Sequence, residues 1–203
     1  MTEITASAVA ALRRKSGAGM MDCKKALAEA GGDEQKAMEI LRQKGLKTAD
    51  KKAGRSTGEG RIYAYIHHNQ KVGVLLEVVC ETDFVARGED FENLLKDLGM
   101  HIAAAVPSPL AVEASGIPEE AVEAERRVML GAEDLADKPA EIQEKIVEGR
   151  VRKFIQERAL LEQEFVKDPS KTVGDRLKEV IAKVGENIRI RRFVRFELGE
   201  GEE

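Results

Sequence analysis

Few residues able to do covalent chemistry occur here at spacings that would let them act together. Cys23 and Cys80 each lack a neighbouring base in the sequence, so we expect both to be small buried side chains rather than nucleophiles. The three histidines have no metal-ligand spacing with either cysteine. The run GRSTGEG at 54–60 has glycines but lacks the lysine of a phosphate-binding loop. The sequence therefore predicts no catalytic residue, no metal site and no cofactor site.

One short segment, Thr82-Asp83-Phe84-Val85, is unusual for its position. It lies in a predicted loop between a strand and a helix, and its two apolar residues are flanked by acidic and basic ones. A phenylalanine at a loop tip either plugs the protein's own core or is offered to a partner. From the pattern alone we favour the plug, although aromatic anchors flanked by charge are also typical of interface hot spots.

Composition narrows the class of protein. The 203 residues suit one or two small domains. The chain has 33 Lys and Arg against 37 Asp and Glu, a net charge of −4, which argues against a protein built mainly to coat phosphate backbones. No run approaches the roughly 18 apolar residues of a membrane span, and no secretory signal is visible. Two cysteines are too few for a disulfide scaffold, so we expect a reduced, cytoplasmic chain.

The first 45 residues are predicted to form three short helices. Apolar residues at helical spacing cover about 5–15, 21–30 and 33–45, and glycines follow each stretch as stops. Such a unit is near the lower size limit for an independent core. Residues 46–60 then form a basic and glycine-rich linker. We interpret it as a solvated hinge, and the alternative is an electrostatic foothold for an acidic partner.

Residues 61–80 change to an alternating apolar pattern, which predicts a β-hairpin. A helix is predicted to follow over about 90–105. A later helix, over about 172–184, is ended by Gly185 and precedes an alternating strand over 188–198. We expect that strand to join the hairpin in a three-stranded antiparallel sheet.

One face of this sheet is expected to need a cover. Ile62, Ala64 and Ile66 are assigned to the strongly apolar face of the hairpin. The other face is left with these apolar residues: Tyr63, Tyr65, Leu75, Val79 and Phe193. Because this is much apolar surface to leave in water, we infer that a second copy of the chain covers it. The alternative is that residues 110–167 fold back over it.

Residues 117–167 are mostly helical and highly charged, with a break at Asp137-Lys138-Pro139. Two helices joined there suggest an antiparallel hairpin over about 117–160 that protrudes from the body. The apolar residues expected to meet between the helices are Val122, Val128, Met129, Ile142, Ile146, Phe154 and Ile155. The predicted fold class is therefore α+β. A three-helix domain over 1–45 and the linker precede an α+β core domain over 61–203, which contains the hairpin.

Two long runs resemble signature segments of one known family. They are LRRKSGAGMMDCKKAL at 12–27 and EVVCETDFVAR at 77–87, in the same order and at the same spacing as in bacterial elongation factor Ts. The later stretches VEGRVRKF, SKTVGDRLKEVIAKVGENIRIRR and VRFELGEG resemble the family too, so the similarity covers essentially the whole chain. The chain departs from the long family form, because it has one hairpin, one TDFV segment and one terminal strand.

The resemblance implies a guanine-nucleotide exchange factor for elongation factor Tu, a GTPase that delivers aminoacyl-tRNA to the ribosome. Thr82, Asp83, Phe84 and Val85 match the family segment that disturbs the partner's Mg²⁺ site, with the aromatic side chain pushed in near the nucleotide. This reverses the interpretation of Phe84 as a core plug. An exchange factor makes and breaks no bond, in agreement with the missing catalytic residues.

The resemblance also implies further contact residues. The N-terminal bundle is similar to the family's ubiquitin-associated-like domain, in which Leu12, Met20 and Met21 match positions that touch the partner's GTPase domain. His68 and Gly185 match further family contacts. The short family form is a homodimer through its sheet, so one subunit could supply Phe84 while the other supplies His68 and Gly185.

Two other functions remain as alternatives. The first is a non-exchanging adaptor that docks a GTPase or another acidic partner without ejecting its nucleotide. The second is nucleic-acid binding, which the following residues of the last strand support: Arg189, Arg191, Arg192, Phe193 and Arg195. The net charge and the alternation of that strand disfavour it, so we expect neither a direct nucleic-acid partner nor a membrane.

Overall fold

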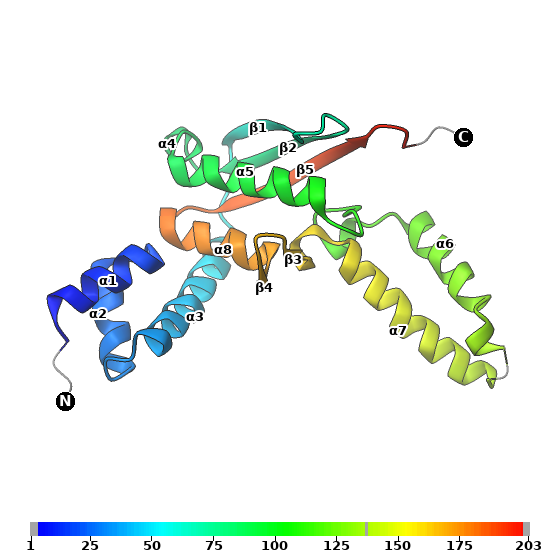
Figure 1. Cartoon of the computed structure of the whole chain (residues 1–203), viewed down its shortest axis with the longest axis horizontal. Helices are drawn as coiled ribbons and strands as arrows, with labels where there is room; N and C mark the ends of the chain where they lie inside the picture. Colours follow the sequence, from blue (N-terminus) through cyan, green and yellow to red (C-terminus); the bar gives the residue numbers. More distant parts are fainter. Residues whose placement is uncertain (1–3, 137, 201–203) are drawn as a thin grey trace. The chain divides into compact units, whose positions relative to one another are not determined.

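The computed structural model describes residues 4–136 and 138–200 (Figure 1). Backbone contacts divide the chain into two compact units, each assembled from separate stretches of sequence. The first unit comprises Met1–Arg61, Val79–Leu94 and Asp175–Arg189. The second comprises Ile62–Val78, Leu95–Gly174 and Ile190–Glu203. Helices and an antiparallel sheet make up the fold, so the predicted α+β class is confirmed. The domain division at 1–45 and 61–203 stays a prediction.

Three helices open the chain, as predicted: α1 (Ala6–Ser16), α2 (Met20–Glu29) and α3 (Glu34–Lys52). The Thr5 hydroxyl caps α1 by accepting from the Ala8 N–H at 3.2 Å, and Gly17 ends it in the left-handed conformation with φ of 68°. The buried core of the bundle consists of Val9, Leu12, Cys23, Ala26, Leu27, Ala37 and Leu41.

Helix α3 is longer than the sequence predicts. It was expected to stop at Gly45, yet it continues to Lys52, so part of the predicted linker is helical. Gly45 faces α8 (Val173–Val184), where an added Cβ would lie 3.4 Å from Ala182 Cβ, an ordinary van der Waals distance. Gly45 thus lies inside a continuous helix and does not end it. An ion pair of 2.8 Å between Asp50 and Lys178 joins the same two helices.

The sheet has three strands, as predicted, and their order is β1-β2-β5. They are β1 (Glu59–Ile66), β2 (Val72–Cys80) and β5 (Ile188–Glu197) (Figure 1). Helix α5 (Glu89–Ala104) follows β2 after a short α4 (Asp83–Ala86). The sheet and α5 therefore form where the alternating and helical patterns predict them.

The predicted assignment of the hairpin's two faces is wrong. The His67 N–H donates to Val72 O at 2.9 Å, which places Tyr65 opposite Val74. Opposite residues share a face, so the tyrosines lie with the buried valines of β2. A shift by one residue in an antiparallel pair exchanges the faces completely. Helix α5 covers Tyr65, since an added Cβ at Gly99 would lie 2.8 Å from Tyr65 Cβ.

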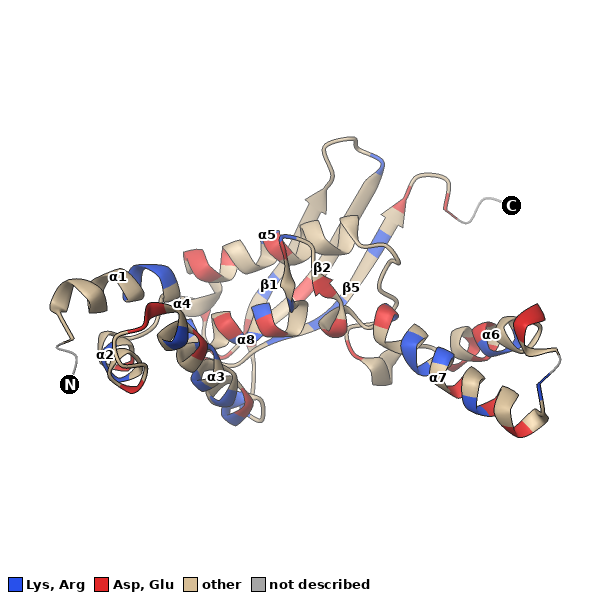
Figure 2. Ribbon diagram, turned by 60° about the horizontal axis from the view of Figure 1, so that its bottom comes forward, with Lys and Arg blue, Asp and Glu red and all other residues tan. Residues whose placement is uncertain are grey.

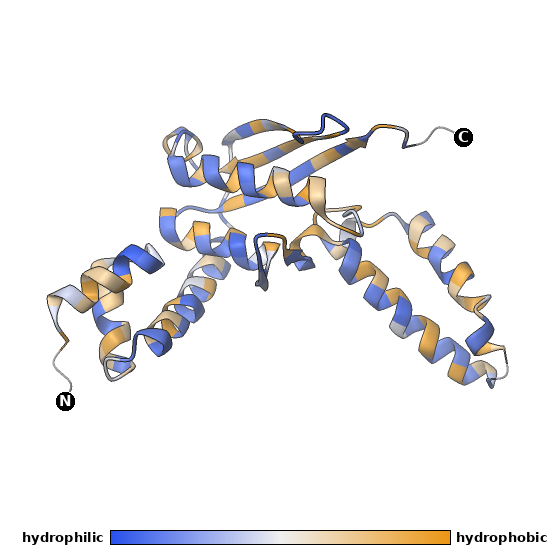
Figure 3. Ribbon diagram, in the orientation of Figure 1, coloured by the Kyte–Doolittle hydropathy of each residue, from blue (hydrophilic) through white to orange (hydrophobic). Residues whose placement is uncertain are grey.

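The other face of the sheet is the exposed one and carries an apolar patch. Its exposed apolar residues, called here the sheet patch, are Ile62, Ile66, Leu75, Val194 and Phe196. Strand β5 changes phase in its middle, since Arg191 and Arg192 are both exposed and both donate to Glu77. The alternation of orange and blue along β5 in Figure 3 reflects this mixed pattern.

Two antiparallel helices form the predicted hairpin, α6 (Glu119–Leu130) and α7 (Ala140–Arg158). Its buried core is Leu135, Val147 and Val151, against which Val122, Met129, Ala132, Ile146 and Ile155 pack. Val128 and Ile142, expected at this interface, are exposed instead. Pro139 directly precedes α7 as predicted, while Asp137 lies outside the described residues. Both helices carry acidic and basic residues, which are interspersed along α7, whereas the acidic residues of α6 precede its arginines (Figure 2).

A two-stranded sheet, β3 (Glu164–Phe165) with β4 (Asp168–Thr172), was not predicted, because a two-residue strand has no periodicity to detect. His101 is buried beside it. Its Nδ1 accepts from the Val166 N–H at 3.2 Å, and its Nε2 lies 3.0 Å from Gln163 Oε1. Burial lowers the pKa of His101, so the neutral ring has a structural role.

Substituting Gly99 with alanine should destabilise the sheet's packing on α5. An added Cβ at Gly99 would lie 2.8 Å from Tyr65 Cβ, so the free energy of unfolding should fall by about 1–3 kcal/mol. Gly149 of α7 is the matched control, because nothing lies within 4 Å of its added Cβ. Gly149→Ala should raise stability by up to about 1 kcal/mol. Urea unfolding followed by circular dichroism measures both, and equal midpoints for Gly99→Ala and the unchanged protein would contradict the packing.

Candidate functional site

The segment after β2 is a single helical turn rather than the predicted loop. Thr82 is the N-cap of α4, with φ of −131° and ψ of 156°, and its hydroxyl accepts from the Val85 N–H at 3.4 Å. Asp83 occupies the first turn, where a negative charge faces the positive end of the backbone dipoles. The sequence folds this way because threonine followed by an acidic residue is a favourable helix start.

This turn points its apolar residues in opposite directions. Val85 and Ala86 are buried, whereas Phe84 is 84% exposed. The interpretation of Phe84 as a core plug, drawn from the pattern alone, is therefore wrong. Asp83 and Arg87, on either side of Phe84 in the sequence, form an exposed ion pair of 3.1 Å with each other. The result is a large aromatic side chain exposed to water on a turn that also carries an ion pair.

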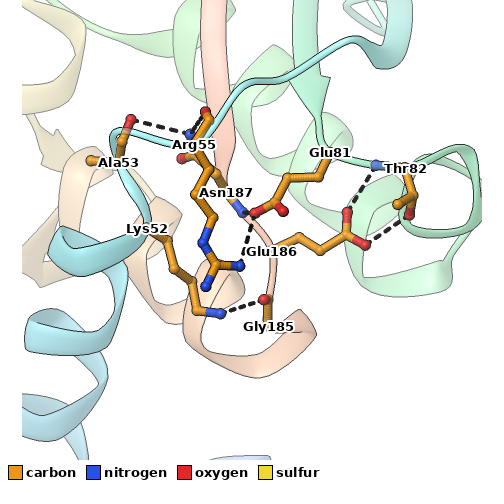
Figure 4. Close-up of polar contacts among 8 residues, drawn as sticks. All are labelled: Lys52, Ala53, Arg55, Glu81, Thr82, Gly185, Glu186 and Asn187. Carbon is orange, nitrogen blue, oxygen red and sulfur yellow. Dashed lines mark hydrogen bonds and ion pairs between the residues drawn. The ribbon is translucent and has the colours of Figure 1, made fainter.

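Glu186 holds the start of this turn. Its Oε2 accepts from the Thr82 N–H at 3.0 Å and its Oε1 accepts from the Thr82 hydroxyl at 2.7 Å (Figure 4). Both oxygens of one carboxylate thus bind the backbone and the side chain of one residue. Hydrogen bonds to a charged acceptor are stronger than neutral ones.

The residues next to Glu186 are themselves fixed. The Asn187 N–H donates to Glu81 Oε1 at 2.6 Å, and its buried side-chain amide donates to Ala53 O at 3.2 Å and Arg55 O at 2.8 Å. Lys52 donates to Gly185 O. In Figure 4 the 185–187 turn lies between the end of α3 and the Glu81-Thr82 pair. Segments far apart in sequence therefore meet around Phe84's turn.

Cys80 lies directly beneath this turn and is not a nucleophile. The thiol donates to Thr82 O at 3.1 Å. Burial raises the pKa of the Cys80 thiol, and the Glu186 carboxylate raises it further, so the thiol is protonated at neutral pH. Cys23 is buried in the N-terminal bundle, and the prediction that both cysteines are buried is confirmed.

The other predicted contact residues have different surroundings. Met20 and Met21 are exposed at the start of α2, whereas Leu12 is 0% exposed in the bundle core. Gly185 ends α8 with φ of 81°, as predicted, and adjoins Glu186. His68 is exposed in the β1–β2 turn, with its ring 4.2 Å from that of His67. The structure thus brings Gly185 near Thr82 through Glu186, and brings Met20 and Met21 together on α2.

Sequence reasoning missed Glu186 and Asn187. They stand more than 100 residues from Thr82, and no local pattern connects them to it. The only signal was their presence in the GEN run of the resemblance. In the part of the chain that the structure describes, His, Cys, Asp and Glu side chains form no group of three or more suited to a metal ion.

Residues 23–200 match the family described as "Elongation factor TS". The chain belongs to the elongation factor Ts family. It is 54% identical over 201 residues to the elongation factor Ts of Gloeothece citriformis, covering 99% of this chain and 70% of that one. It is 53% identical over 201 residues to a Synechocystis elongation factor Ts, covering 99% of this chain and 92% of that one. It is 54% identical over 198 residues to the elongation factor Ts of Caldanaerobacter subterraneus, covering 98% of this chain and 98% of that one.

Family membership makes the chain an elongation factor of protein biosynthesis. Across residues 4–136 and 138–200, no helix is long and apolar enough to cross a membrane.

Proposed function

We propose that this chain is a guanine-nucleotide exchange factor for elongation factor Tu, acting in the cytoplasm. The observation that carries the proposal is the exposed Phe84, presented on a turn whose N-cap is held by a carboxylate. A large aromatic side chain flanked by charge is the kind of residue that dominates protein interfaces. Within the residues that the structure describes, Phe84 is 84% exposed, so it does not serve the protein's own core.

The mechanism is displacement rather than bond chemistry. In GTPases the Mg²⁺ ion bridges phosphate oxygens and protein ligands, so a small shift there weakens nucleotide binding. Thr82, Asp83, Phe84 and Val85 form the displacing segment, with Phe84 entering the partner near this ion. Coupling between sites is reciprocal, so GDP must weaken the exchange factor's binding as much as the exchange factor weakens that of GDP.

The N-terminal bundle supplies a second contact. Met20 and Met21 are exposed neighbours on α2, and methionine suits an adaptable apolar interface. His68 is exposed and Gly185 is half-buried, and we propose both as further contacts with elongation factor Tu. Leu12 supports this contact from the bundle core, where its side chain is buried.

Release of fluorescent GDP from elongation factor Tu in a stopped-flow instrument tests the function. We expect strong acceleration by this chain, with the acceleration suppressed by excess GDP. An adaptor would bind the GDP-bound and nucleotide-free partner equally well without accelerating release, and that result would replace exchange by docking. Tight RNA binding that weakens steeply with salt would favour the nucleic-acid alternative. Arg191 and Arg192 already engage Glu77, so we expect no such binding.

We also propose that the sheet patch is covered by a second copy of the chain. Ile62, Ile66, Leu75, Val194 and Phe196 expose much apolar surface on one flat face, which is unusual for a monomer. A sheet face can pack on itself across a two-fold axis, because each copy presents the same surface. We therefore propose that the second copy covers the sheet patch, on the face opposite to the one predicted from the sequence.

Phe196→Glu should dissociate this dimer. Phe196 is 68% exposed, so the change costs the monomer little but buries a charge in the interface, and the dimer dissociation constant should rise at least tenfold. Val128→Glu is the control, because Val128 is 70% exposed on the separate helical hairpin. Sedimentation equilibrium measures both. If the unchanged protein is a monomer at micromolar concentration, the dimer is refuted. If both variants remain dimers, the dimer interface is not the sheet patch.

A further inference from the structure

We propose that Glu186 is a positioning residue for nucleotide exchange, acting on Phe84 through Thr82. The inference rests on the proposed function of the displacing segment. Glu186 leaves the partner contact to Phe84, and its role is to fix the turn that carries the ring. Both of its carboxylate oxygens are committed to Thr82, at 3.0 Å and 2.7 Å.

The turn is too short to be stable without contacts from the rest of the fold. Helix α4 has four residues, Asp83–Ala86, and isolated helices of that length are unstable in water. The bond from the Val85 N–H to the Thr82 hydroxyl is long, at 3.4 Å. Buried Val85 and Ala86 anchor one side of the turn, but an apolar contact is non-directional and does not fix where Phe84 points. Within the turn, the Ala86 N–H donates to Thr82 O at 3.2 Å, and the Cys80 thiol donates to the same carbonyl. Glu186 adds the two bonds that hold the Thr82 N–H and hydroxyl from across the fold.

A carboxylate suits this position chemically. Thr82 offers two donors, a backbone N–H and a hydroxyl, and an ionised carboxylate supplies an acceptor for each. Donating its proton to Glu186 leaves the hydroxyl's lone pairs free to accept from the Val85 N–H. An amide in place of the carboxylate has only one acceptor oxygen, so one Thr82 donor would face an NH₂ group.

The support behind Glu186 makes it rigid. Gly185 on one side receives the Lys52 ammonium, and Asn187 on the other is bound to Glu81, Ala53 and Arg55 (Figure 4). Asn187 is 1% exposed, so these bonds are shielded from water. A binding group held rigidly in its bound orientation loses less freedom on binding. The network therefore favours an oriented Phe84 over a mobile one.

The expected signature is a split between rate and affinity. Met20 and Met21 offer a binding surface that Glu186 does not touch, so the partner should still be captured when Glu186 is changed. Glu186→Gln and Thr82→Val should each lower the maximal rate of GDP release about tenfold, with a smaller change in the half-saturating concentration. Thr82→Ser keeps the hydroxyl and should restore most of the rate.

A double-mutant cycle and a partner-free readout complete the test. If Glu186 acts through Thr82, the combined Glu186→Gln and Thr82→Val variant should be little slower than Thr82→Val alone. Hydrogen exchange of the Thr82 and Val85 amides should speed up in Glu186→Gln, while that of the β2 amides should not. Glu39→Ala, at an exposed position of α3, is the control and should match the unchanged protein in every assay.

The outcomes separate this inference from the proposed function. An unchanged protein that does not accelerate GDP release overturns the exchange function and the role of Glu186 with it. An active unchanged protein whose Glu186→Gln variant keeps its full rate and its amide protection overturns the role of Glu186 alone. A Glu186→Gln variant with the same maximal rate but weaker binding would make Glu186 a direct contact, which also overturns positioning.

Discussion

Replacing Phe84 with alanine should slow GDP release from elongation factor Tu by about 10- to 100-fold at saturating exchange factor, the effect of losing an interface hot spot. The protein itself should be unaffected, because Phe84 is 84% exposed and its removal leaves no cavity. Stopped-flow release of fluorescent GDP gives the rate, and thermal unfolding checks the fold. The loss should appear mainly in the maximal rate, since Met20 and Met21 remain available for binding.

Two comparisons sharpen this result. Val128→Ala removes an apolar, 70% exposed side chain from the helical hairpin and should leave release unchanged. Phe84→Leu keeps apolar bulk without the flat ring, so its rate of GDP release should lie between those of Phe84→Ala and the unchanged protein. If Phe84→Ala accelerates release as well as the unchanged protein does, displacement of the Mg²⁺ site by this ring is wrong, although exchange itself would stand.

Most of the fold was predictable because its signals are local. Glycine stops and apolar spacing predicted the three N-terminal helices, and alternation predicted β1, β2 and β5. Errors arose where packing between distant segments decides the outcome. Gly45 follows a helical stretch in the way that a stop would, yet it lies inside α3 against Ala182. Tyr63 and Tyr65 lie on the face opposite to the predicted one, because the turn determines the pairing register of the hairpin. Neither fact is encoded within a short window of sequence.

The candidate site divides in the same way. The family resemblance predicted Thr82, Asp83, Phe84 and Val85 as the contact segment. The local sequence pattern alone predicted that Phe84 is buried in the core. The side on which a residue of a four-residue helix lies follows from the anchoring of its neighbours, here buried Val85, and a single loop sequence does not reveal it. Glu186 was missed for a related reason, because its partner lies across the fold.

Leu12 tests the limit of transferring contact residues by resemblance. Its side chain is 0% exposed, so Leu12→Ala should lower the stability of the N-terminal bundle by about 2–5 kcal/mol through the cavity that it leaves. A bundle near the lower size limit has little stability to lose, and much of it should be unfolded at 37 °C. Thermal unfolding followed by circular dichroism, with amide exchange of α1–α3 residues, measures this loss.

Met21→Ala is the matched variant, because Met21 is 64% exposed and its removal should change stability by no more than about 0.5 kcal/mol. It should weaken binding to elongation factor Tu while the bundle stays folded. Leu12→Ala should weaken binding only at temperatures where the bundle is melted, and cooling should restore it. Weaker binding by a fully folded Leu12→Ala would mean that Leu12 leaves the core to touch the partner. The two variants therefore distinguish a residue that builds the contact surface from a residue that belongs to it.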